Sequence, residues 1–125
     1  MTHDNDERKA CLIYSGFVKY FPKAMVEVAL VSKAGNDQHN PGEPLRWVKE
    51  KSRDELNSLQ RHLLDAGTRD VDGHRHSAKV AWRAMANLER EIEMEQGYDY
   101  NPDTDKWEKM HKCTDKCVSV RERAR

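Results

Sequence analysis

The chain has 125 residues, the size of one domain, and its 22 Lys and Arg residues balance its 22 Asp and Glu residues. A formal net charge of zero argues against a general nucleic-acid coat protein, which would be basic, and no stretch approaches the roughly 20 apolar residues that cross a bilayer. Because only 37% of the residues are hydrophobic and 35% are charged, we expect some disordered sequence and apolar faces that a partner subunit completes.

The start of the chain and its cysteines indicate a cytoplasmic protein. The first nine residues are polar and contain no apolar region of the kind found in a signal peptide. Cys11, Cys113 and Cys117 form an odd set without a disulfide framework, as expected for reduced thiols in a cytosol.

Residues 1–8 are predicted to form a mobile polar tail, and residues 11–20 are compatible with a short strand or a loop. A first helix is predicted from Pro22 to Ala34, because proline suits the first helical turn and Gly35 suits the position just past the end. This helix is apolar almost all round, so we expect it to be largely buried.

A long loop is predicted over residues 36–47. Pro41, Gly42 and Pro44 lie within it, and a helix does not continue through that composition. Long ordered loops often carry function, so its polar residues are candidates for binding.

Two further helices are predicted, over residues 52–66 and 74–95. Ser52 and Glu55 have the spacing of a capping box at the start of the first of these. Each helix has an apolar stripe at helical intervals. The stripe residues are Leu56, Leu59 and Leu63 in one helix and Val80, Ala81, Ala84, Met85, Leu88 and Ile92 in the other. Residues 106–120 are compatible with one more short helix.

Carboxylate and imidazole groups on these helices are candidate catalytic or metal-binding groups. Glu27 lies in the middle of the apolar first helix, where lost hydration must be replaced by a metal ion or by a buried salt bridge. Glu55 and His62 are two turns apart at one edge of the leucine face, an edge that can face a cleft, although Glu55 equally suits a capping role. His76 lies near an edge of the stripe on the third helix.

Two acids and two bases lie around the start of the third helix. Asp70 and Asp72 offer the carboxylate oxygens that Mg²⁺ and Mn²⁺ take as ligands, although Asp72 also suits a helix N-cap. Lys79 and Arg83 are one turn apart, so they can grip a triphosphate or form a solvated basic face.

The predicted loop adds candidate groups for binding a nucleoside. Gln38, His39 and Asn40 can contact a base or a sugar through hydrogen bonds. Trp47 either stacks on a base or packs in the core.

Four short stretches occur together in one order. They are residues 35–42 (GNDQHNPG), 61–63 (RHL), 70–73 (DVDG) and 76–84 (HSAKVAWRA). Together they resemble the phage-type dATP/dGTP diphosphohydrolase family, which is related to the MazG-like all-α pyrophosphohydrolases, and in particular the MazZ-type (d)GTP diphosphohydrolases of phages that replace adenine with 2-aminoadenine. The resemblance covers residues 17–95.

The resemblance implies an all-α, MazG-like helical bundle that assembles as a dimer or a pair of dimers. It implies two or three Mg²⁺ or Mn²⁺ ions per site, and hydrolysis of dGTP, GTP or dATP to the monophosphate and pyrophosphate in the cytoplasm of a phage's host. MazG relatives carry an EExxE motif on the first helix, whereas this chain has only Glu27 there. The metal site would therefore be built differently, with His62, His76, Asp70 and Asp72 contributing.

We therefore expect a polar N-terminal segment (residues 1–16), a catalytic helical core (17–97) and a charged C-terminal extension (98–125). The residues predicted to be catalytic are Glu27, His62 and His76; the predicted metal ligands are Glu27, Glu55, Asp70 and Asp72; the predicted substrate contacts are Gln38, His39, Asn40, Trp47, Lys79 and Arg83. The expected partners are a nucleoside triphosphate and further copies of the chain, with no membrane and no direct nucleic-acid contact. The main alternative is a non-catalytic helical interaction protein whose charged tails dock a partner.

Overall fold

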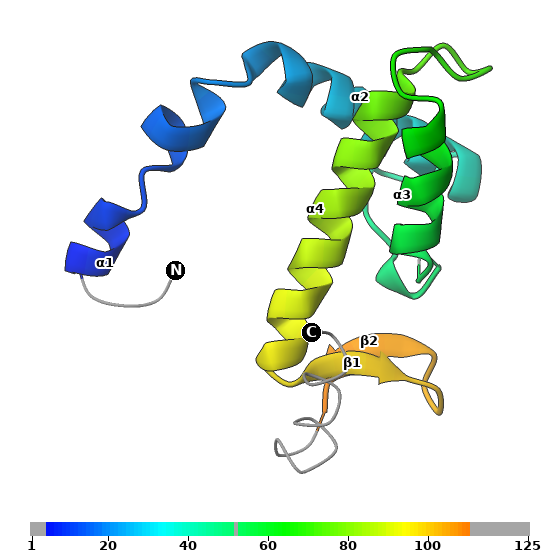
Figure 1. The fold of residues 1–125 in the computed structure, drawn as a ribbon. Helices are drawn as coiled ribbons and strands as arrows, with labels where there is room; N and C mark the ends of the chain where they lie inside the picture. The colour runs from blue at the N-terminus through cyan, green and yellow to red at the C-terminus, as the bar shows by residue number, and fades with distance from the viewer. Residues whose placement is uncertain (1–4, 52, 111–125) are drawn as a thin grey trace.

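Two neighbouring helices form the centre of the fold (Figure 1). The structure is a computed structural model that describes residues 5–51 and 53–110. These helices are α3 (Glu55–Leu64) and α4 (His76–Glu95). A third helix, α2 (Pro22–His39), packs on α4. The part of the chain that the structure describes is therefore mostly helical, as the sequence predicted.

A two-stranded antiparallel hairpin follows α4. Strand β1 (Tyr98–Asn101) pairs with β2 (Lys106–Lys109), and the hairpin contacts α4 and the short turn η2 (Lys49–Lys51). The prediction of a helix over residues 106–120 is wrong for residues 106–109, which form β2. Residues 111–120 are outside the described residues. The all-α prediction needs the same correction.

Hydrogen bonds from Trp107 hold the hairpin in place. Its indole N–H donates to Glu93 Oε1 at 3.0 Å, and its backbone N–H donates to Glu50 Oε1 at 2.9 Å. Lys49 Nζ neutralises Glu93 at 2.5 Å. A buried carboxylate needs such partners, so these contacts also fix η2 beside α4.

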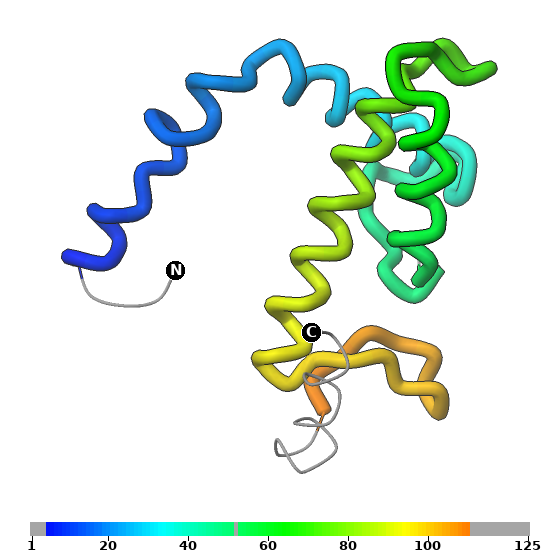
Figure 2. Tube along the Cα trace, in the orientation of Figure 1, coloured from blue at the N-terminus to red at the C-terminus, as the bar shows by residue number. Residues whose placement is uncertain are grey.

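The N-terminal arm, residues 5–21, extends away from the helices (Figures 1 and 2). It contains α1 (Asn5–Ala10) and the π-helical turn η1 (Tyr14–Val18), so neither a structureless tail at residues 5–8 nor a strand at residues 11–20 is correct. α1 has acids in its first turn and bases in its last turn, which favours a helix through its dipole.

Helix α2 begins at Pro22, as predicted, but it continues past Gly35 to His39. A glycine inside a helix costs only about 1 kcal/mol relative to alanine, which does not suffice to end it. The helix ends at Asn40 instead, because the residue before a proline, here Pro41, disfavours the helical conformation. The loop is therefore shorter than the sequence suggested.

Asn36 holds this loop against α2. Its side chain is buried and donates to the Glu43 carbonyl at 3.1 Å. Its Oδ1 accepts from Asn40 Nδ2 and from the Arg46 backbone N–H, both at 3.3 Å. One amide therefore satisfies groups on the helix end and on both limbs of the loop.

The faces of α3 and α4 that meet are largely polar. Glu55 and Ser58 are buried on α3, and His76 and Arg90 are buried on α4. Most members of the predicted apolar stripes lie on the outside instead. The exposed ones are Leu56 and Leu63 on α3 and Ala84, Met85, Leu88 and Ile92 on α4, whereas Leu59, Val80 and Ala81 are half-buried. α3 also begins three residues later than predicted, and Ser52 of the expected capping box is outside the described residues.

The prediction that the first helix is largely buried is also wrong within a single chain. Met25, Val26 and Leu30 are exposed, and Asn36 is the buried residue of α2. Among the described residues, only Ala78 and Ala86 form a buried apolar core. No helix in the described ranges is both long and apolar enough for a membrane span.

We predict that Asn36→Ala destabilises the protein by about 2 kcal/mol, since it leaves buried partners of the amide without a hydrogen bond. Urea denaturation monitored by circular dichroism measures this loss. Asn87→Ala is the matched control, because Asn87 makes one exposed contact with Glu91 and its loss should change stability by about 0.5 kcal/mol or less. Equal losses in the two variants would contradict the role of Asn36.

Candidate active site

A cleft of about 480 Å³ lies between the end of α2, the loop after it, α3 and α4. It is lined by more basic than acidic side chains. The basic residues are Arg46, Lys51, Arg53, Arg61, Lys79 and Arg83, and the acidic residues are Asp54, Asp70 and Asp72. A concave surface with this excess of positive charge suits a polyanionic ligand.

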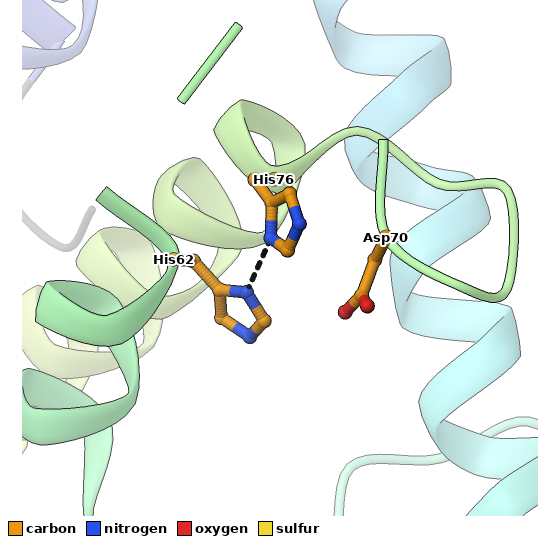
Figure 3. Close-up of side chains that lie close together, drawn as sticks. All are labelled: His62, Asp70 and His76. Atoms are coloured by element: carbon orange, nitrogen blue, oxygen red, sulfur yellow. Dashed lines mark hydrogen bonds between the residues drawn. The ribbon is translucent and has the colours of Figure 1, made fainter. Parts of the chain in front are cut away.

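Two histidines from different helices meet beside the cleft. The Nδ1 atoms of His62 on α3 and His76 on α4 are 2.9 Å apart (Figure 3). One ring must donate and the other accept, so the pair holds one proton between these nitrogens. Burial, together with the positive charges of Lys79 and His76, lowers the pKa of His62. His62 is therefore suited to be the neutral member.

Asp70 completes a three-residue group with these histidines. One ligand atom from each of His62, Asp70 and His76 lies within 4.8 Å of the others. Asp70 is positioned by a tight loop in which its N–H donates to the His74 carbonyl at 2.8 Å. Gly73 allows the turn with a φ of 87°, a value that other residues rarely adopt.

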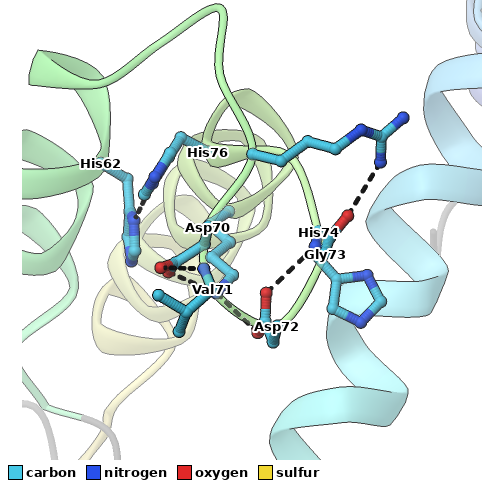
Figure 4. Close-up of polar contacts among 9 residues, drawn as sticks. His62, Asp70, Val71, Asp72, Gly73, His74 and His76 are labelled. Carbon is cyan, nitrogen blue, oxygen red and sulfur yellow. Dashed lines mark hydrogen bonds and ion pairs between the residues drawn. The ribbon is translucent and has the colours of Figure 1, made fainter.

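The same loop positions the second acid (Figure 4). Asp72 Oδ1 accepts from the His74 N–H at 3.0 Å, and Asp70 Oδ1 accepts from the Val71 N–H at 2.7 Å. The N-cap of α4 is Arg75, so Asp72 does not cap the helix and its remaining oxygen faces another partner.

That partner is Lys79, which lies between the two acids. Its Nζ is 2.8 Å from both Asp70 Oδ2 and Asp72 Oδ2. The hydrogen bond from Lys79 and that from the Val71 N–H lower the pKa of Asp70 to about 2, and Lys79 likewise lowers the pKa of Asp72. Burial alone would lower the pKa of Lys79, but its hydrogen bonds to the two acids outweigh burial and raise it.

The donor atoms of the three-residue group fit a divalent metal ion. A neutral imidazole nitrogen and an ionised carboxylate are the forms that bind metals, and the lowered pKa values favour these forms in His62 and Asp70. Imidazole is a ligand for transition metals, whereas Mg²⁺ prefers oxygen.

Glu55 lies two turns before His62 on α3 and is bound to an arginine. Its carboxylate is buried and accepts from Arg83 Nη1 at 3.2 Å. This contact aligns α3 with α4 and directs the arginine along the cleft wall. Its predicted role as a metal ligand stays a prediction.

Glu27 is not near the three-residue group. It lines a separate apolar groove of about 590 Å³ between the start of α2 and the start of α4, and it accepts from Arg75 Nε at 2.9 Å. Glu27 therefore has a salt-bridge partner, but the pair is exposed and is not the buried salt bridge that the sequence left open as an alternative. The predicted catalytic and metal roles of Glu27 stay predictions.

The four predicted nucleoside contacts all line the cleft. Gln38 and His39 are exposed there, whereas Asn40 is buried and accepts from Lys51 Nζ at 3.1 Å, so its amide is already used in structure. Trp47 packs edge-on against Trp82 with ring centroids 5.5 Å apart, which makes the two indoles one wall of the cleft.

Several cleft residues were not identified from the sequence. Arg61, Arg46 and Arg53 supply half of its basic side chains, and Trp82 supplies half of its aromatic wall. Arg61 and Trp82 belong to the stretches that carried the family resemblance, which was the available signal. Arg46 and Arg53 flank η2. Their positions in the sequence do not indicate that this turn lies beside α4, so they could not be predicted as cleft residues.

We predict that Lys79→Met destabilises the protein by about 2 kcal/mol or less at pH 7, because it leaves two acids without their cation. The pKa of Asp70 is about 2 when folded and 3.8 otherwise, so this stabilisation is present above pH 4 and is lost as the pH falls toward 2. Urea denaturation across this pH range should show the difference from wild type shrinking.

The control variant is Lys33→Met, which removes an exposed ion pair with Asp37 and should change stability by about 0.5 kcal/mol or less. A deficit in Lys79→Met that is equally large at pH 7 and near pH 2 would contradict the electrostatic explanation.

Comparison with protein families identifies the chain. Residues 2–101 match the sequence model of the N-terminal domain of dATP/dGTP diphosphohydrolases. The match includes the whole cleft and extends beyond residues 17–95, so it also covers the N-terminal arm. Comparison with curated proteins and with solved structures gives no match. Since the matched region is four-fifths of the 125 residues, the chain belongs to the dATP/dGTP diphosphohydrolase family.

Proposed function

We propose that the cleft binds a deoxynucleoside triphosphate and hydrolyses it to the monophosphate and pyrophosphate. The observation that carries the proposal is the excess of basic side chains around a cleft that is lined by His62 and Asp70, with His76 directly behind His62. A triphosphate needs both features, because its negative charge must be neutralised and a water molecule must be activated for attack.

The arrangement of the lining favours one orientation of the substrate. Lys79, Arg83 and Arg61 lie on α3 and α4 near the histidines, where they would bind the phosphates. Trp47 and the exposed Gln38 lie on the loop side, where an aromatic ring and an amide suit a base. Because Asn40 is held by Lys51, we assign base contacts to Gln38 and His39 before Asn40.

His62, His76 and Asp70 would hold a divalent ion, with Asp72 beside them as a further ligand. Such an ion supplies charge neutralisation and lowers the pKa of bound water. The sequence resemblance implied two or three Mg²⁺ or Mn²⁺ ions. We propose Mn²⁺ at the histidine-containing position, because two of its three donors are nitrogen.

In the reaction, an oxygen of water forms a bond to the α-phosphorus, and the bond from that phosphorus to the bridging oxygen breaks. The electron pair leaves with pyrophosphate, and the proton of the attacking water passes to a base. The lowered pKa of His62 keeps its ring neutral near pH 7, which is the form in which a ring nitrogen can bind the metal ion. Lys79 and Arg83 stabilise the charge that develops on the phosphate oxygens.

We propose dGTP as the substrate, with GTP and dATP as the alternatives, and a role in remodelling the nucleotide pool of a phage-infected cell, including a 2-aminoadenine DNA pathway. We also propose that the enzyme acts as a homo-oligomer, a dimer or a tetramer. The small apolar core and the outward-facing stripes support self-association.

Incubation of the purified protein with each dNTP and NTP and with Mn²⁺ or Mg²⁺ should yield monophosphate and pyrophosphate, resolved by ion-exchange chromatography. We expect His76→Gln to lower kcat/KM by about a hundredfold or more, because the variant loses a donor of the three-residue group. His74→Gln, two residues earlier in the chain and outside the three-residue group, is the control and should keep most activity. Diphosphate and phosphate as products would contradict the proposed bond cleavage.

Metal binding is tested without turnover. Mn²⁺ together with a non-hydrolysable nucleotide should raise the Tm of wild type and of His74→Gln, and should raise that of His76→Gln much less. A non-catalytic interaction protein predicts no metal-dependent shift in any of the three.

A further inference from the structure

An apolar stripe on α4 has no partner among the described residues. Met85, Leu88 and Ile92 are between 45% and 54% exposed, and their spacing puts them on one face of the helix. Ala78 and Ala81 continue this row toward the start of α4, where they line the apolar groove against α2. The intervals along the row alternate between three and four residues, the pattern of a helix that packs along a second helix.

The N-terminal arm carries a row of exposed aromatic side chains that leads into the same groove. Tyr14 and Phe17 lie in the π-helical turn η1, Phe21 lies just before α2, and the three are between 42% and 68% exposed. Ala24 and Val28 follow them in α2, where they line the groove opposite the alanines of α4. The groove therefore joins the apolar surface of the arm to the apolar row of α4.

The arm and the α4 row also have opposite charges. Between Arg8 and Val26 the chain has basic residues, including Lys19 and Lys23, and no acid. The exposed acids beside the α4 row are Glu89, Glu91 and Glu95. Two α4 rows packed on each other would bring like charges together, whereas an arm on α4 pairs opposite charges.

The N-terminal arm exposes apolar surface that a partner would cover. Leu12, Ile13 and Tyr14 are each more than half exposed. Neither α1 nor η1 packs substantially on the helices of its own chain (Figure 2). Contiguous exposed apolar surface of this kind marks a site of protein association.

We propose that two copies of this chain exchange their N-terminal arms, so that residues 14–21 of each copy cover Met85, Leu88 and Ile92 of the other. The proposal specifies the surfaces of the self-association proposed above and is independent of the hydrolytic chemistry. The contact occurs twice around a two-fold axis, which closes the assembly. A dimer of this kind buries the aromatic side chains of the arm and places Lys19 near the α4 acids.

Sedimentation equilibrium of the full chain should give twice the 14.6 kDa chain mass. Phe17→Glu and Leu88→Glu should each weaken dimerisation at least a hundredfold, because each buries a charge in an apolar contact. Leu45→Glu, at an exposed leucine outside both rows, is the matched control and should stay dimeric. A monomeric wild type would overturn the self-association, and a dimeric Phe17→Glu would overturn the assignment to the arm.

Photo-crosslinking separates this contact from a pairing of two α4 rows. A photoreactive benzoylphenylalanine at position 17 in an unlabelled copy, mixed with ¹⁵N-labelled wild type and exchanged, should crosslink to labelled peptides that contain residues 85–92. The same group at position 45 should not. Crosslinks confined to a single copy, or to α3 of the other copy, would refute arm exchange even if the protein is dimeric. This readout needs no substrate or metal, so its failure is distinct from a failure of the proposed hydrolysis.

Discussion

The polar contact between α3 and α4 is the constraint on which the site depends. A buried polar group must keep a hydrogen-bonding partner, and four such groups, Glu55, Ser58, His76 and Arg90, lie on these two helices. The pairing of Glu55 with Arg83 and the contact of His76 with the ring from α3 each tolerate little sliding, since hydrogen bonds weaken steeply with misalignment. The helices are thus aligned by the groups that form the cleft, and stability and site geometry have the same origin.

The sequence predicted where the helices lie along the chain. It did not predict which part of the protein covers each face of a helix. Pro22 and the helical spacing located the helices, because these signals act through nearby backbone. His62 and His76 were each predicted at a helix edge, and the structure brings their Nδ1 atoms to 2.9 Å from each other. The orientation of the stripes was not predictable in the same way, because a pattern such as Met85 and Leu88 identifies an apolar face without saying which chain covers it.

Longer-range contacts explain the remaining differences. Glu27 was read as a buried carboxylate, but its helix is covered on one side only, and Arg75 from a distant loop meets it. The sequence did not indicate the structural roles of Asn36 and Asn40, since their hydrogen bonds cross a loop whose shape depends on Pro41 and Gly42. The basic residues near η2 join the cleft only because the hairpin and α4 hold that turn in place.

Lys79 links the electrostatics of the folded protein to the proposed reaction. Its ammonium group already neutralises Asp70 and Asp72, so a divalent ion that takes Asp70 as a ligand must compete with a cation 2.8 Å away. A triphosphate changes this balance, because its oxygens offer Lys79 another anionic partner while they also bind the metal ion. Metal and nucleotide would then bind more tightly together than either does alone, which is the reason to measure thermal shifts with both present. The same exchange would bring the lysine onto the phosphates, where charge develops during cleavage.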